Sequence, residues 1–237
     1  LMSVMTLRAL SALLHYPDDT LIAAIGDIRN ALREEAMLSP AQMARIDGLL
    51  LQLETGDVMT HQEAYVALFD RSRSHCLHLF EHVHGESRDR GQAMVDLRDR
   101  YIAAGLDPAS NELPDYLPLF LEYCSTLPRA EALIALAEPG PIIALLADRL
   151  EERGTAYAAI FAVLADLAGA ERGTVPTDAP LPDIDPDDLD ALDKEWEEEQ
   201  ITFGAMAPSA PDAPADCPQV RDMVTRLLTP EPAQRSQ

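Results

Sequence analysis

Apolar residues along most of this chain recur at steps of three and four positions, the spacing of one face of an α-helix. One such stripe consists of Met43, Ile46, Leu50 and Leu53. Ser39 stands where a helix N-cap belongs, and Pro40 takes the first helical position. The pattern therefore predicts a helix that begins at residue 40.

Similar patterns continue through the first 173 residues. A helix is predicted after Pro17, with Asp18 and Asp19 in its first turn, where negative charge suits the helix dipole. Gly154 is either a break between two helices or a weak point in one longer helix. The other stripes are Met94, Leu97 and Tyr101, then Ile143, Leu146 and Leu150, then Tyr157, Ile160, Phe161, Leu164 and Leu167.

Signals for β-strands are nearly absent, since no Asn-Gly or Asp-Gly turn separates alternating β-branched runs. No period of about 20–50 residues repeats, which argues against a solenoid. The predicted fold class is all-α: a single-domain, multi-helix bundle over residues 1–173.

The composition changes near Gly173. Residues 174–237 hold 10 of the 18 prolines, with 4 bases and 15 acids for a net charge of −11. We expect this acidic, Pro-rich tail to be largely flexible, because it has little apolar area to bury. A short helix near 187–203 is one alternative, which would dock on the core or on a partner. Its apolar face would carry Leu189, Leu192, Trp196 and Phe203.

The net charge of −23 changes the range of partners. Nucleic acid would be repelled, and anionic membrane surfaces are disfavoured, whereas a basic peptide would be attracted.

No apolar run approaches the roughly 18 residues of a spanning helix, so no direct membrane insertion is expected. The three cysteines, Cys76, Cys124 and Cys217, form no Cys-x-x-Cys pair, and no signal peptide is evident. These features predict a cytoplasmic protein.

Histidines and acids crowd the region around residues 75–91. A zinc, nickel or copper site is one interpretation, with His75, His78, His82 and His84 near Cys76, Glu81 and Glu86. Their spacing matches no specific metal motif, so we favour histidines that cap helix ends and bind backbone groups, with no metal. Nucleophile elbows and phosphate-binding glycine loops are missing, and an enzyme is not expected.

The middle of this polar run has the signature of a turn followed by a helix. Gly85 supplies a conformation that is barred to residues with a Cβ, and Ser87 stands at the N-cap position. Arg88 and Arg90 oppose the helix dipole in the first turn. They are therefore expected either to pair with acids across the fold or to contact a partner.

A second constellation covers residues 112–123. Pro114 and Pro118 restrict the chain around a helix start, where Asp115 is predicted to be the cap. The following residues are more apolar than one buried stripe requires. Either this helix is central and buried on most sides, or part of it lines a groove.

Three motifs, in this order, resemble those of the NarJ family of nitrate reductase assembly chaperones. They are Tyr65-Val-Ala-Leu-Phe69, His82-Val-His-Gly-Glu-Ser-Arg-Asp-Arg-Gly91 and Leu113-Pro-Asp-Tyr-Leu-Pro118. Pro114-Asp115 followed by Leu121-Glu-Tyr123 is also similar to the wider TorD/DmsD group. Trp196-Glu-Glu-Glu-Gln-Ile-Thr-Phe-Gly204 loosely resembles the acidic C-terminal segment of the family.

The resemblance implies a TorD/NarJ-type bundle that acts as a chaperone. Its partner would be the N-terminal segment of the catalytic (alpha) subunit of respiratory nitrate reductase, held until its molybdenum bis-guanine dinucleotide cofactor is inserted and the complex assembles, before membrane attachment. The client carries this cofactor, and the chaperone binds none stably. A chaperone for another molybdoenzyme is the alternative, and a His-rich metal-dependent enzyme is an alternative of a different class. The oligomeric state stays open.

The three motifs supply a hypothesis for the peptide site. Leu68 and Phe69 of the first motif, and Tyr116, Leu117 and Phe120 of the constellation at 112–123, are expected to be partly accessible, since a groove must be reachable by its ligand. The full predicted set is Tyr65, Leu68, Phe69, His82, Glu86, Arg88, Arg90, Asp115, Tyr116, Leu117 and Phe120.

Overall fold

The computed structural model describes residues 4–82, 88–106 and 112–173, which lie within one compact unit, although the side chains of 88 and 89 are not described. This part of the chain is all-α, as predicted, without a strand longer than a single bridge. The α-helices are α1 (Met5–Leu13), α2 (Asp19–Glu35), α3 (Pro40–Thr55), α4 (Val58–Tyr65), α5 (Arg88–Ala103), α6 (Leu117–Thr126), α7 (Arg129–Ala137), α8 (Gly140–Glu152) and α9 (Ala158–Ala168). Shorter turns are η1 (Val66–Asp70, a π turn), η2 (Arg73–His75) and η3 (Leu79–His82).

Local signals set several helix ends as predicted. The Ser39 hydroxyl accepts the Gln42 N–H, while the Gln42 side chain accepts the Ser39 N–H at 2.8 Å, a complete capping box for α3. The Asp18 carboxylate accepts the Leu21 N–H at 2.8 Å and caps α2. Gly154 has a φ of +68° and lies between α8 and α9, so it is a break.

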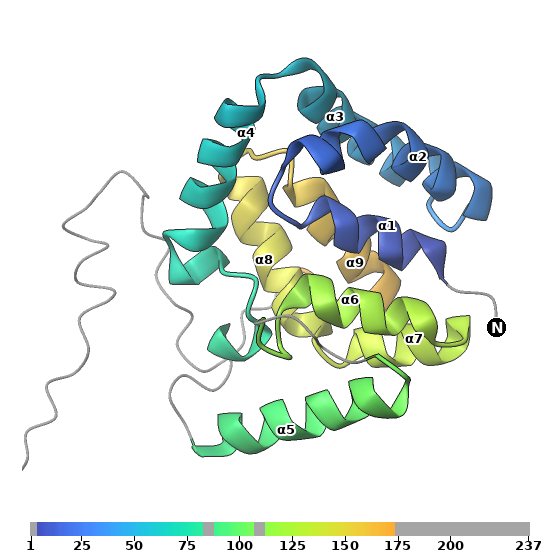
Figure 1. The fold of residues 1–237 in the computed structure, drawn as a ribbon, viewed down its shortest axis with the longest axis vertical. Coiled ribbons are helices and arrows are strands. Elements are labelled where there is room, and N and C mark those ends of the chain that lie inside the picture. Colours follow the sequence, from blue (N-terminus) through green and yellow to red (C-terminus); the bar gives the residue numbers. More distant parts are fainter. Residues whose placement is uncertain (1–3, 83–87, 107–111, 174–237) are drawn as a thin grey trace, which may run out of the picture. The chain divides into compact units, whose positions relative to one another are not determined.

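The core centres on α9, which α8, α7 and α3 surround (Figure 1). Every residue of α9 from Ala158 to Ala165 is buried. The predicted stripe of Ile143, Leu146 and Leu150 on α8 is completely buried against this helix. α1 packs on α6, and α2 on α1 and α3.

Four aromatic side chains from distant parts of the chain form a cluster inside this core. Tyr65 and Phe69, at the end of α4 and in η1, contact Tyr157 and Phe161. The Phe69 ring lies 5.0 Å from that of Tyr65 and 5.2 Å from that of Tyr157, distances typical of favourable ring pairs. The first family-like motif is therefore part of the core.

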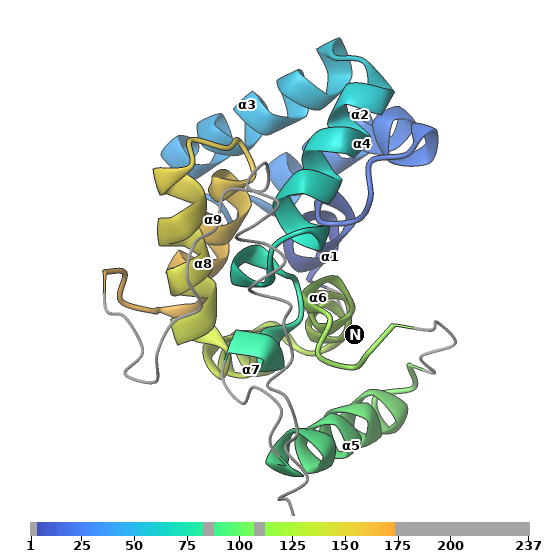
Figure 2. The same cartoon turned by 90° about the vertical axis from the view of Figure 1, so that its left-hand side faces the viewer.

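α5 lies on the outside of the bundle, next to α6 and α7 (Figures 1 and 2). Leu97 and Tyr101 of the predicted stripe are buried, and the Tyr101 hydroxyl donates to the Pro114 carbonyl at 2.7 Å. Val95 and Ile102 are exposed on the other side of the helix. Few apolar side chains thus hold α5 against the core.

Among the described residues, no single helix is both long and apolar enough to cross a bilayer, although the α7–α8 pair, bent by 70°, passes the same test of length and composition.

Candidate functional site

The third family-like motif meets, through its backbone, the segment that directly precedes the second motif. The segment Leu77–Phe80 pairs with Asp115–Leu117 in an antiparallel bridge between His78 and Tyr116. The Leu117 N–H donates to the Leu77 carbonyl at 2.8 Å, and the Leu79 N–H to the Asp115 carbonyl at 3.1 Å. The start of α6 is therefore fixed to the turn that precedes α5.

Asp115 completes this junction with its side chain, which is fully buried. Its carboxylate accepts the Phe80 N–H at 3.1 Å and lies 3.3 Å from His78 Nδ1. This hydrogen bond raises the pKa of His78. The predicted cap role is wrong: α6 begins at Leu117 without a side-chain cap, because the carboxylate is used by a segment 35 residues away in sequence.

Two other histidines of the polar run, His75 and His82, have protein partners, and His75 Nδ1 lies 3.0 Å from the Ser74 hydroxyl oxygen. The His82 Nε2 donates to the Cys76 carbonyl at 2.9 Å, and burial lowers the pKa of this imidazole. Burial also raises the pKa of the Cys76 thiol to about 12, which leaves it protonated and a poor nucleophile. Within the described ranges, no three His, Cys, Asp or Glu side chains are grouped to hold a metal ion; His84 lies outside those ranges.

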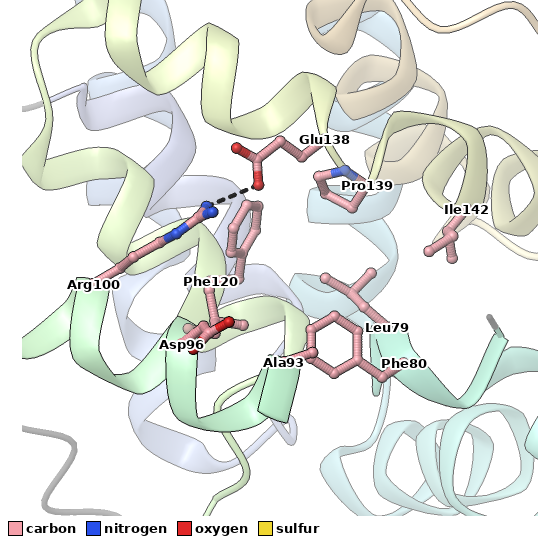
Figure 3. Close-up of a pocket in the computed structure, with 10 residues that line it drawn as sticks. Leu79, Phe80, Ala93, Asp96, Arg100, Phe120, Glu138, Pro139 and Ile142 are labelled. Atoms are coloured by element: carbon pink, nitrogen blue, oxygen red, sulfur yellow. Dashed lines mark hydrogen bonds and ion pairs between the residues drawn. The ribbon is translucent and has the colours of Figure 1, made fainter. Parts of the chain in front are cut away.

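A pocket of about 290 Å³ opens beside the junction, between α5, α6 and the start of α8 (Figure 3). Its walls are mainly apolar, and its rim carries charge. The Arg100 guanidinium pairs with Glu138 at 2.8 Å, and Asp96 accepts a hydrogen bond from Gln92. The lining residues are Leu79, Phe80, Ala93, Asp96, Leu97, Arg100, Phe120, Glu138, Pro139 and Ile142.

The expected accessibility of the predicted groove is wrong for four of its five residues. Leu68 and Phe69 are only 8% and 3% exposed, because η1 turns them into the core. Leu117 is fully buried, and Phe120 is 3% exposed at the base of the pocket. The motifs are rich in apolar residues mainly because they build the core.

Other predicted residues lie nearer the surface. Tyr116 is half-buried, with its ring 5.5 Å from His78. Arg90 binds Glu81 at 2.9 Å, so it pairs with an acid across the fold, one of its two predicted uses. His82 is half-buried, whereas Tyr65 is buried and donates its hydroxyl to the Leu14 carbonyl at 2.8 Å. Glu86 and the Arg88 side chain lie outside the described residues, as do the turn at Gly85 and the cap at Ser87.

Of the predicted site residues whose side chains the structure describes, only Phe120 lines the pocket. The sequence reading missed Phe80, Ile142, Glu138 and Pro139 as site residues, since they come from separate elements that meet only in the folded chain. Ile142 directly precedes the buried stripe that begins at Ile143, so it falls outside the predicted buried face of α8.

The fold resembles that of a solved structure. It matches the crystal structure of a putative redox enzyme maturation protein from Archaeoglobus fulgidus with a TM-score of 0.52 and 20% identity, over 70% of this chain and 93% of that one. At this level of identity the likeness shows the fold alone.

The family follows from sequence. The nitrate reductase delta subunit family matches residues 30–163, more than half of the chain. The Escherichia coli K12 nitrate reductase molybdenum cofactor assembly chaperone NarJ is 45% identical over 197 residues, covering 82% of this chain and 83% of that protein. The probable chaperone NarW of the same strain is 39% identical, over 83% of this chain and 83% of that protein. The probable NarJ of Bacillus subtilis is 32% identical, over 67% of this chain and 85% of that protein. The chain belongs to this family, and the resemblance inferred from its motifs is confirmed.

Proposed function

We propose that this protein is a nitrate reductase molybdenum cofactor assembly chaperone that binds the N-terminal segment of the catalytic subunit in the pocket between α5, α6 and α8. Family membership supports the chaperone role. The peptide site rests on one observation: the pocket combines apolar walls with two rim carboxylates, Asp96 and Glu138. We further propose that binding takes place in the cytoplasm, before the client attaches to the membrane.

The pocket fits a peptide side chain better than a nucleotide cofactor. A volume of about 290 Å³ accommodates one large apolar side chain, whose burial contributes about 1.5–3 kcal/mol. The molybdenum bis-guanine dinucleotide cofactor is far larger, and the rim carboxylates would repel its phosphates. We therefore assign that cofactor to the client, with this chain as a chaperone and not an enzyme.

The rim favours a basic residue next to the inserted side chain. Glu138 is about half exposed in its pair with Arg100, and such surface pairs contribute about 0–1 kcal/mol. Exchanging Arg100 for a cation of the peptide would therefore cost little. The net charge of −23 would add long-range attraction and speed association at low salt.

A matched pair of isoleucines tests this site. Ile142 is half-buried in the pocket wall, whereas Ile134 on neighbouring α7 is 69% exposed and does not line it. Calorimetry with the synthetic N-terminal peptide of the catalytic subunit should show at least about tenfold weaker binding for Ile142→Glu, because the new carboxylate would be desolvated on binding. Ile134→Glu should bind like the original chain.

Melting temperatures of both variants show whether they remain folded. Equal binding by two folded variants would remove the pocket from the proposal. Absence of binding to the unsubstituted chain at low salt would remove the proposed client segment. The corresponding peptide of another molybdoenzyme, titrated under the same conditions, tests the alternative client.

A further inference from the structure

The pocket raises the question of what covers its apolar walls when no client is bound. Phe80 and Ile142 are only half-buried there, and solvation of such surface is unfavourable. The N-terminal client segment is one occupant. A segment of the same chain could also occupy the pocket, and it is present whether or not the client is.

We infer that residues 187–197 of the C-terminal tail bind this pocket in the client-free protein, with Trp196 as the inserted side chain. Leu189, Leu192 and Trp196 recur at steps of three and four, which places them on one face if the segment is helical. Trp196 is the only tryptophan of the chain, and its indole has the size that the pocket accepts. This segment lies outside the described residues, so the inference rests on its sequence and on the pocket.

The described chain ends at Gly173, close to the helix that lines the pocket, and this position makes the contact accessible. Arg172 pairs with Asp148 at 2.7 Å and with Glu151 at 2.6 Å, and the Gly173 N–H donates to Asp148 at 2.7 Å. Hydrogen bonds from Arg172 and from Arg45 lower the pKa of Glu151 to about 2, so this anchor stays charged at neutral pH. The last described residues, Arg172 and Gly173, are therefore bound to side chains of α8, the helix that contributes Ile142 to the pocket.

The tether is long enough to reach the pocket. Ile142 and Asp148 are six residues apart on α8, or about 9 Å along its axis. Residues 174–188 span up to about 50 Å when extended. Attachment through a linker of this length gives an effective concentration of about a millimolar, so even weak contacts would keep the pocket partly occupied.

Charge makes this cover easy to displace. The segment carries acids beside its apolar residues, including Asp190, Asp193 and Glu197, and these would face the rim carboxylates Asp96 and Glu138. A basic segment meets the same rim with attraction. The tail therefore acts as a weak internal competitor; this competition rests on the proposed client site, whereas the tail contact itself does not.

Quenching of Trp196 fluorescence by acrylamide in the full-length chain tests the contact without any client. We expect Trp196 to be shielded in the original chain and in Ile134→Glu. It should become accessible in Ile142→Glu, and also in the tail variant Leu189→Ser/Leu192→Ser, which leaves the core sequence intact. Equal quenching in all four proteins, whether strong or weak, would overturn the inference. Shielding that is lost on dilution would also overturn it, because it would indicate a second copy of the chain as the occupant.

Client affinity supplies a second readout. Replacing Leu189, Leu192 and Trp196 together with serine should strengthen binding of the client peptide about threefold to tenfold, because a site that is only partly open binds with reduced apparent affinity. Unchanged affinity would contradict competition. If the original chain binds no client peptide but Trp196 is shielded in a manner that depends on Ile142, the proposed client site fails and the tail contact stands.

Discussion

Two clusters of apolar side chains in this protein differ in how far they are enclosed. The aromatic cluster of Tyr65, Phe69, Tyr157 and Phe161 is buried inside the bundle. The pocket around Phe80 and Ile142 has one wall, α5, that is held to the bundle by few side chains. Apolar density in a motif therefore marks packing, whereas accessibility depends on how completely the neighbouring elements enclose it.

The largest difference between the two clusters should appear in phenylalanine truncations. Phe69→Ala leaves a cavity in the closed core and should lower the free energy of unfolding by about 3–5 kcal/mol. Phe80→Ala removes a half-buried ring from the pocket wall and should cost about 1 kcal/mol or less. Urea unfolding of both variants checks this, and equal losses would erase the distinction between closed core and open wall.

Asp115 connects the junction to the pocket, and its removal should have the next largest effect. Asp115→Ala leaves the partly buried Phe80 N–H without its acceptor and should cost about 1–3 kcal/mol. Asp115→Asn retains an acceptor oxygen and should cost less. We expect the alanine variant also to bind client peptide more weakly, because Phe80 would lose its fixed position. Chemical unfolding and calorimetry on the same samples would show whether the two losses occur together.

Two glycines that do not line the pocket, Gly56 and Gly48, provide reference values for these changes in the free energy of unfolding. A Cβ at Gly56 would collide with the buried His61 ring, so Gly56→Ala should destabilise by about 1–3 kcal/mol. Gly48 lies within α3 with nothing near its Cβ position, and Gly48→Ala should stabilise by roughly 0.5–1 kcal/mol. Thermal unfolding of the two variants should shift in opposite directions, and neither should alter peptide binding.

The smallest expected effect concerns pH. Hydrogen bonding to Asp115 raises the folded-state pKa of His78 above its ordinary value of 6.5. The stabilisation from protonated His78 should therefore be fully present below pH 6.5 and disappear as pH rises through the raised folded pKa. His78→Gln compared with the original chain should show the larger stability difference on the acidic side. A difference that grows as pH rises would show that His78 is not held by Asp115 as described.

Local rules were sufficient for much of the fold. The capping box at Ser39, the cap at Asp18 and the buried stripe of Ile143, Leu146 and Leu150 all depend on residues within a few positions of each other. The buried stripe of Tyr157, Ile160, Phe161 and Leu164 is equally local, since it lies in and just before α9. Such features need no knowledge of which elements meet.

The candidate site could not be predicted from local sequence in the same way. Asp115 has the position of a helix cap after Pro114, yet its partners are Phe80 and His78, brought close only by tertiary structure. Leu68 looked like a groove residue because an apolar motif is compatible with a core and with a binding surface alike. The pocket lies where α5, α6 and α8 meet, and no single stretch of sequence contains its pattern.

The claim that the client segment enters the pocket is tested most directly by photo-crosslinking. A client peptide with benzoylphenylalanine in place of one apolar residue at a time would be irradiated with the full-length chain, and the attachment sites mapped by mass spectrometry. We expect at least one position to attach mainly to Leu79, Phe80, Leu97 or Ile142, and this attachment should be lost in Ile142→Glu but kept in Ile134→Glu. Attachment from every position to helices that do not line the pocket, such as α2 and α3, would contradict the account.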